Sequence, residues 1–174
     1  MQIDINTAGM DTLVRRFRAL PKQAERAEKR AVGKTTTKAR SELVKDVARQ
    51  NQITQKIIRR FRSARKISRS RLTGIAWLGY RPIKASYVGK PRQTKRGVRV
   101  RRFFFEGAFV ATMPSGHTGV FKRKGKERLP IVEQVIELQR AVQSADSVRD
   151  RMGDEFIKRF QQELNFEVNV KGQR

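Results

Sequence analysis

The sequence has no cysteine and only one histidine, and these two shortages exclude several classes of protein. Without cysteine there is no disulfide framework and no thiolate metal site, and His117 alone cannot build a histidine-based metal site. We therefore expect no metal and no cofactor. No apolar run approaches the roughly 20 residues that span a bilayer, and MQIDINTAGMD lacks the charge pattern of a signal peptide. We expect no membrane partner and a chain that stays in the cytoplasm where it is made.

Catalytic signatures are missing as well. Glu106, Glu127 and Glu133 are the carboxylates near the predicted sheet, and none has the spacing of an acid/base pair or a metal-ligand set. The phosphate-binding GxxxxGK[ST] loop, the GxGxxG fingerprint and the GxSxG elbow are absent. We interpret His117, in the turn PSGHT, as a solvated loop histidine because no partner that would orient it is visible. The sequence predicts a protein that is not an enzyme.

The abundant feature is positive charge. Lys and Arg number 41 against 16 Asp and Glu, a net charge of +25. Between Val47 and Phe105 there are 18 Lys or Arg residues and no acid. A solvated surface normally mixes both signs, so this one-sided stretch predicts contact with a polyanion, either nucleic acid or an acidic protein. The candidate contacts are the cations of the segment Lys56–Arg71, namely Arg59, Arg60, Arg62, Arg65, Lys66 and Arg69.

Helical periodicity appears in four segments. Small and apolar residues recur at three- and four-residue steps from Lys22 to about Gln50, which predicts one long amphipathic helix with Pro21 in its first turn and a weak point at Gly33. A shorter helix is expected before Pro21, and another over Thr54–Phe61. From about Val142 to Leu164 the period near 3.6 is clearest. The Ala-rich start of the long helix, at Ala27 and Ala31, is the predicted subunit interface because it is too apolar for a free surface.

Strand patterns occupy most of the remaining chain. Alternation predicts an edge strand at Gln2–Asn6, and an apolar run predicts a buried strand at Leu72–Tyr80. Phe103–Met113, Gly119–Lys124 and Leu129–Val132 suggest an antiparallel meander, and Phe166–Val170 a last strand. The three consecutive phenylalanines Phe103 to Phe105 favour one face in a core and the other against a neighbouring element or subunit. They fit an aromatic platform for nucleic acid less well.

Lys90–Gly97 has four cations and almost nothing apolar, so we expect a flexible basic loop or arm. The length of 174 residues suits a single domain. We therefore predict one α+β domain over 1–174, in which the long N-terminal amphipathic helix and the C-terminal helix pack on a small antiparallel sheet.

The segment GAFVATMPSGHTGVFKRKGKERLPI, from Gly107 to Ile131, resembles the minor tail protein Z, or tail-completion, family of long-tailed bacteriophages and prophages. In that family a G-x-F strand leads through a turn to V-F-x-R, and a basic G-K-x-R turn leads into L-P-I. The matching residues here are Gly107, Phe109, Gly119, Val120, Phe121, Arg123, Gly125, Lys126, Arg128, Leu129, Pro130 and Ile131.

The resemblance implies an α+β structural protein in the virion, at the head-proximal end of the tail, that assembles as a homo-oligomeric ring, expected to be a hexamer. Its implied partners are the tail terminator, head-completion or connector proteins, and double-stranded DNA in the lumen. The charge alone supports equally well a monomeric nucleic-acid-binding protein without a ring-forming role. A small nuclease would need a carboxylate or histidine cluster that the sequence does not show.

Overall fold

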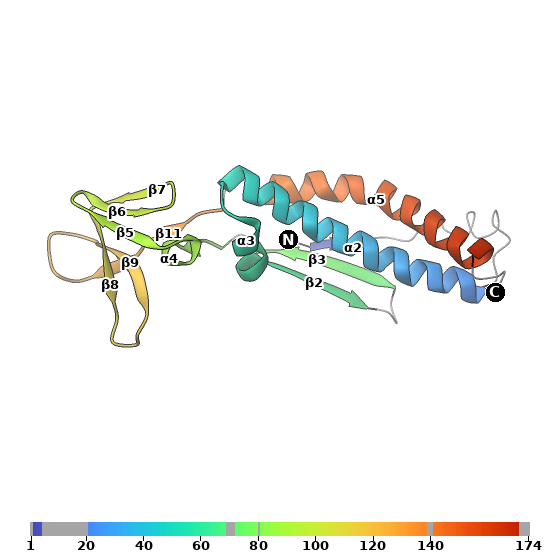
Figure 1. Cartoon of the computed structure of the whole chain (residues 1–174), viewed down its shortest axis with the longest axis horizontal. Helices are drawn as coiled ribbons and strands as arrows, with labels where there is room; N and C mark the ends of the chain where they lie inside the picture. The colour runs from blue at the N-terminus through green and yellow to red at the C-terminus, as the bar shows by residue number, and fades with distance from the viewer. Residues whose placement is uncertain (1, 5–20, 69–71, 80, 139–140, 171–174) are drawn as a thin grey trace.

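The computed structural model describes residues 2–4, 21–68, 72–79, 81–138 and 141–170. Two long helices lie at one end of an elongated molecule and a group of short strands lies at the other (Figure 1). The elements in chain order are β1 (Gln2–Asp4), α2 (Pro21–Asn51), α3 (Gln55–Arg62), β2 (Ser63–Ser68), β3 (Thr73–Leu78), β4 (Ile83–Lys84), α4 (Ala85–Val88), β5 (Pro91–Thr94), β6 (Gly97–Val100), β7 (Phe103–Glu106), β8 (Ala108–Thr112), β9 (Thr118–Arg123), β10 (Ile131–Glu133), β11 (Val135–Ile136), α5 (Ala141–Asn165) and the π-helical turn η1 (Phe166–Val170).

The helices α2 and α5 confirm the two long helices predicted from periodicity. They pack along each other through a cluster in which Ala27, Ala31 and Val32 of α2 meet Phe156, Phe160 and Leu164 of α5. The small alanines leave room for the two phenylalanine rings, whose centroids are 6.2 Å apart. α2 continues through Gly33 without a break, because packing against α5 outweighs the local cost of about 1 kcal/mol for glycine.

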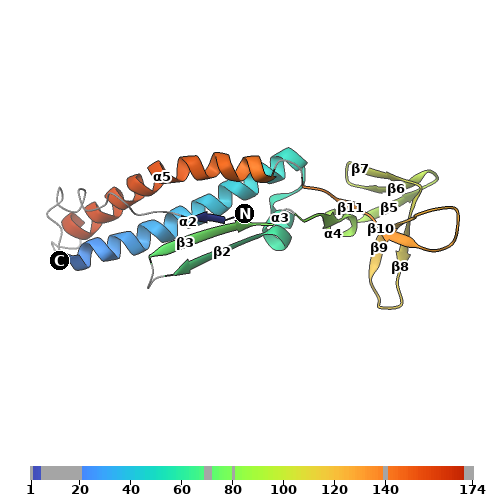
Figure 2. The same cartoon turned by 180° about the vertical axis from the view of Figure 1, so that it is seen from behind.

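A three-stranded antiparallel sheet, ordered β1-β3-β2, lies against the other side of α2. Figure 2 shows the resulting order of layers, with α5, α2 and the sheet one below the other. Helix and sheet approach closely at Gly74, where an added Cβ would lie 1.8 Å from the Thr36 hydroxyl oxygen. β1 is an edge strand, as predicted. The strand predicted at Leu72–Tyr80 exists as β3, but only its α2 side is buried, and Trp77 on the opposite side is 45% exposed.

The short strands form a module that the chain enters through β4 and leaves through β11. These two strands pair antiparallel, with Ile136 opposite Ile83. The module contains the sheet β5-β6-β7 and the meander β8-β9-β10. The meander was predicted. The single strand predicted over Phe103–Met113 is wrong, because Gly107 adopts φ +67 and divides it into β7 and β8, which belong to different sheets.

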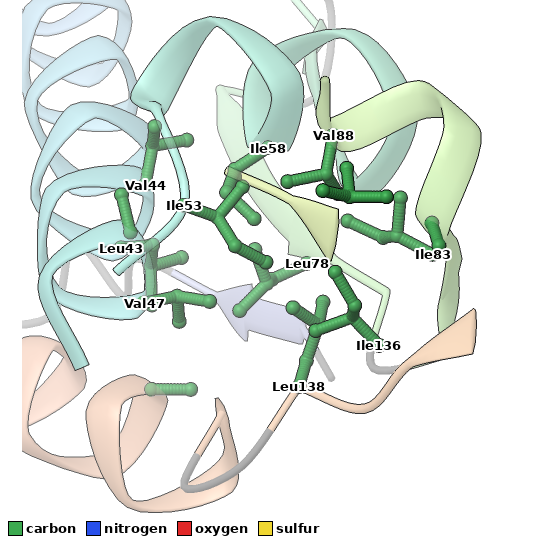
Figure 3. Close-up of a cluster of buried hydrophobic side chains, with 14 of the residues drawn as sticks. Leu43, Val44, Val47, Ile53, Ile58, Leu78, Ile83, Val88, Ile136 and Leu138 are labelled. Carbon is green, nitrogen blue, oxygen red and sulfur yellow. The ribbon is translucent and has the colours of Figure 1, made fainter. Parts of the chain in front are cut away.

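One cluster of buried side chains connects the helices to this module. Figure 3 shows Leu43, Val44 and Val47 of α2 meeting residues from α3, β3, β4, α4 and the segment after β11. The cluster continues through Val98 and Val100 of β6 to Val120 of β9. The module is therefore held to the helices by a continuous apolar core.

Two further predictions differ from the structure. Lys90–Gly97 is a β-hairpin instead of a loop, since β5 pairs with β6 from Pro91 to Thr94. Phe166–Val170 is a π-helical turn that continues α5, although its sequence alternates. The alternation is overridden because the buried carboxylate of Glu167 pairs with the guanidinium of Arg30 on α2. The helix predicted before Pro21 lies outside the described residues.

Candidate nucleic-acid interface

The predicted contacts of the basic stretch Lys56–Arg71 are divided between two elements. Arg59 and Arg60 are exposed on α3, and Arg65 and Lys66 are exposed on β2. Arg69 and the side chain of Arg62 lie outside the part of the chain that the structure describes. Because successive strand residues point to opposite faces, Arg65 projects on the α2 side, where its guanidinium donates to the Thr37 hydroxyl, while Lys66 projects on the open side. This stretch does not form one continuous face.

A second group of cations lies on the outer face of the sheet β5-β6-β7. Arg92 is directly opposite Arg99, and Arg99 is directly opposite Phe104, so these three side chains share a face. Dibasic pairs occupy the two hairpin turns, and Lys90 precedes the first strand. We call this set the arginine face: Lys90, Arg92, Lys95, Arg96, Arg99, Arg101 and Arg102, all exposed.

The cations of the arginine face have no acidic partner among the described residues. Glu106 is the single acid in residues 90–106 of the sequence. Two hollows, of about 470 and 530 Å³, lie on this face, and both include Arg99 in their lining. The sequence patterns did not reveal this face because the segment Lys90–Gly97 was interpreted as a loop. A loop has no strand register, so nothing in that interpretation placed Arg92 and Arg99 on the same side.

The acids lie mainly along the helix pair. Glu163 of α5 forms an ion pair with Arg30 of α2, with Arg30 Nε 3.0 Å from Glu163 Oε2, and Lys38 Nζ is 2.6 Å from Glu155 Oε2. The hydrogen bond from Lys38 is the main reason that the pKa of Glu155 is lowered, against the raising effect of burial. Residues 81–138 hold 14 Lys or Arg and four acids. Arg30 and Lys38 of α2 therefore have acidic partners within the fold, whereas the cations of the arginine face have none among the described residues.

His117 is not the solvated loop residue that the sequence suggested. Its Nε2 lies 2.7 Å from Glu133 Oε1, and the other oxygen of Glu133 lies 2.6 Å from Lys84 Nζ. Burial raises the pKa of Glu133, but the hydrogen bonds from Lys84 and His117 outweigh it and leave that pKa lowered. The bond to Glu133 raises the pKa of Lys84. The partner was missed because Glu133 is 16 residues from His117 and reaches it only through the β9–β10 pairing.

The predicted subunit interface at Ala27 and Ala31 is wrong. Both residues have no exposed surface in the single folded chain, because α5 covers them. An apolar stripe on a helix signals only that something must cover it, and here the cover is the same chain's second helix. Phe104, on the exposed side of the phenylalanine-rich strand, is 45% exposed, whereas Phe103 and Phe105 pack against the core.

The motif residues from Gly107 to Ile131 lie in the meander. Phe109 of β8 is opposite Phe121 of β9, and the Arg123 guanidinium lies 5.9 Å from the centroid of the Phe109 ring. Val120 is fully buried, while Gly125, Lys126 and Arg128 are exposed in the loop that joins β9 to β10. Pro130 follows a cis peptide bond, and its carbonyl accepts from Lys124 N at 3.0 Å. The motif thus combines a packed aromatic strand pair with an exposed basic loop.

The family model described as Prophage minor tail protein Z matches residues 7–171 of the 174-residue chain. The chain belongs to this family. No match was found among curated proteins or among solved structures. The family match extends far beyond the motif in the meander and includes both long helices and the arginine face.

Membership of the minor tail protein Z family gives this protein a structural role in the phage tail, and it implies a place in the virion tail and a non-enzymatic function. Within the described residues, no group of three His, Cys, Asp or Glu side chains is placed to hold a metal ion. None of the helices in the described ranges has the length and apolar character that crossing a membrane requires.

Proposed function

We propose that this minor tail protein Z family member is a tail-completion protein that forms a ring, expected to be hexameric, at the head-proximal end of the tail. In this role it joins the tail to the head and surrounds the DNA path. It is present in the host cytoplasm during assembly and in the neck of the finished virion. The observation that carries the proposal is the family match over residues 7–171, together with an arginine face whose cations lack acidic partners among the described residues.

The charge supports a position between other components. Six chains at +25 each would carry about +150, and this repulsion requires compensation. Duplex DNA supplies roughly one negative charge per 1.7 Å of axis, so a ring roughly 30 Å tall would enclose only about 18 phosphates. Most of the compensation therefore has to come from acidic surfaces of neighbouring rings and from mobile ions. We propose the tail terminator and the head-completion or connector proteins as those neighbours.

Subunit contacts in the ring require apolar surface that one folded chain leaves exposed. The face of β3 turned away from α2 is such a surface, and it carries Trp77 at 45% exposure. We propose this face as a subunit contact in place of Ala27 and Ala31. Replacing Trp77 by Glu should then shift the sedimentation coefficient of the purified protein towards the monomer, whereas replacing the exposed Gln50 by Glu, with the same change of charge, should leave it unchanged.

The junction role is tested in particles made without this protein. We expect formed heads and formed tails that are not productively joined, seen by electron microscopy together with loss of infectivity. Normal joined virions would refute the role, and absent tail tubes would assign the protein to an earlier step. The high positive charge also favours a monomeric nucleic-acid-binding protein, and a monomer at high concentration, with and without tail partners, would select that function.

A further inference from the structure

We propose that the arginine face of the sheet β5-β6-β7 is the surface through which this protein contacts the phosphate backbone of double-stranded DNA. The proposal rests on the proposed function for bringing DNA beside the protein, and it identifies which part of the chain meets that DNA. It replaces the basic stretch Lys56–Arg71 as the main contact.

The first argument is the ladder of like charges across the strands. Arg92 and Arg99 are directly opposite partners on one face, and directly opposite like charges destabilise an antiparallel pair. A fold would normally place an acid or a threonine at one of the two positions. The acids elsewhere in the structure show that pairing is available to this sequence, since Glu155 and Glu163 pair with cations of α2. An uncompensated pair that persists in the folded chain indicates a counter-charge supplied from outside.

The second argument comes from the turns. The two central residues of the β5–β6 turn are Lys95 and Arg96, and those of the β6–β7 turn are Arg101 and Arg102. Hairpin turns favour Asn, Asp and Gly, which adopt positive φ at low cost. Arg101 nevertheless has φ +53. The four cations add charge at both ends of the same sheet, and the conflict at Arg101, a position that Asn or Gly would fill at lower cost, is typical of a functional position.

The third argument is the match between this surface and a duplex. The β5–β6 hairpin belongs to this three-stranded sheet, with Arg92 and Arg99 on its open face and Lys95 and Arg96 in its turn, so its cations can lie along a phosphate backbone. Five of the seven cations are arginines, whose planar fork can bind phosphate through two parallel hydrogen bonds. The two hollows on either side of Arg99 are lined by cations and have room for a phosphate group.

A protein partner fits this surface less well. The centre of a protein interface is depleted of charge and enriched in apolar side chains. Across the described outer face of β5, β6 and β7, Phe104 is the large apolar side chain that is exposed, and it is surrounded by Lys95, Arg96 and Arg99 in the lining of one hollow. The seven cations greatly outnumber it. The face is therefore suited to a uniformly charged backbone more than to a mixed protein surface.

The test compares two triple variants of the full chain with equal net charge. One variant carries Arg92→Gln, Arg96→Gln and Arg99→Gln. The control carries Lys22→Gln, Lys45→Gln and Lys158→Gln, three exposed cations on the helices. Binding to a duplex DNA of arbitrary sequence is measured by fluorescence anisotropy over a series of salt concentrations. Each phosphate contact contributes a log–log slope of roughly −0.9, so the first variant should lose about 2.7 from the slope's magnitude if all three contacts exist. The control should retain the wild-type slope.

Equal slopes for both triple variants would overturn the proposal, because they would show that net charge and not location determines binding. Retained DNA binding with lost binding to poly-L-glutamate would overturn it in favour of an acidic protein partner. Thermal melting of each variant checks folding, and Arg99→Gln alone, with an expected slope loss of about 0.9, replaces the triple variant if that fails to fold. If the arginine face does not bind DNA, particles made without the protein should still show unjoined heads and tails. The two experiments therefore test the DNA contact and the junction role separately.

Discussion

Replacing Ala31 by Glu tests the packing of α2 on α5. Ala31 has no exposed surface and lies in the cluster formed with Phe156, Phe160 and Leu164. The larger side chain would force the helices apart, at a cost of about 1–3 kcal/mol in the free energy of unfolding. It would also bury a carboxylate among apolar side chains that offer it no hydrogen bond or counter-charge. We expect a total loss of about 4 kcal/mol or more. That is a large part of the roughly 5–15 kcal/mol that stabilises an ordinary domain.

Urea denaturation and thermal melting, followed by circular dichroism, measure this loss. A chain of this size loses about 2–4 °C of melting temperature per kcal/mol, so the melting temperature should fall by about 10 °C or more. The control is Gln50→Glu, an exposed position on the same helix, where the change should be within about 0.5 kcal/mol. If Ala31→Glu leaves the melting temperature unchanged and instead reduces the sedimentation coefficient, Ala31 faces another subunit and the reasoning from the helix pair is refuted.

Three other predictions concern the strand module and the ion pairs. Gln93 links β5 to β8, because its side-chain oxygen accepts from Val110 N at 2.9 Å and its nitrogen donates to the carbonyls of Gly97 and Ala108. Gln93→Ala should therefore cost about 1–2 kcal/mol in urea denaturation, and Gln134→Ala, which loses one local bond, should cost less. Arg99→Gln should keep or raise stability by about 0.2–1 kcal/mol at low salt by removing repulsion from Arg92, and a large loss of stability at low salt would contradict it. The pKa of Glu155 lies below its usual value of 4.5, so its carboxylate stabilises the fold above that pH and the contribution disappears as pH falls through the lowered pKa. The stability of the wild type relative to Glu155→Gln should accordingly decrease below about pH 4.5, and a constant difference down to pH 3 would show that the ion pairs with Lys38 and Arg159 contribute nothing.

The helices were predictable because their information is local. The apolar positions of α2 and α5 recur at the helical period over many turns, and Pro21 marks the start of α2 in the sequence itself. The meander β8-β9-β10 was predictable for a similar reason, since its strands are separated by short segments with turn residues. The motif in that meander also indicated the family, which the match over residues 7–171 confirms.

The secondary-structure predictions were wrong where a local sequence pattern is compatible with two different structures. An alternating segment at Phe166–Val170 fits a strand, yet Glu167 binds Arg30, which is 137 residues away, and continues the helical path. A polar basic segment at Lys90–Gly97 fits a loop, yet the backbone of β6 and the Gln93 side chain make it a strand. In both segments the decisive partner is distant in sequence or is a backbone group that the residue types do not reveal.

The sequence by itself determined the α+β class, the two long helices, the family and the excess of positive charge, because each follows from composition or from a short-range period. Tertiary structure alone decided which charges remain available and which apolar faces are covered. Ala27 and Ala31 are covered by α5, and Arg30 and Lys38 of α2 are paired with acids of α5. Arg92 and Arg99 come to lie side by side only when β5 and β6 pair. Charge is a property of a residue, but its compensation is a property of the neighbours that folding provides.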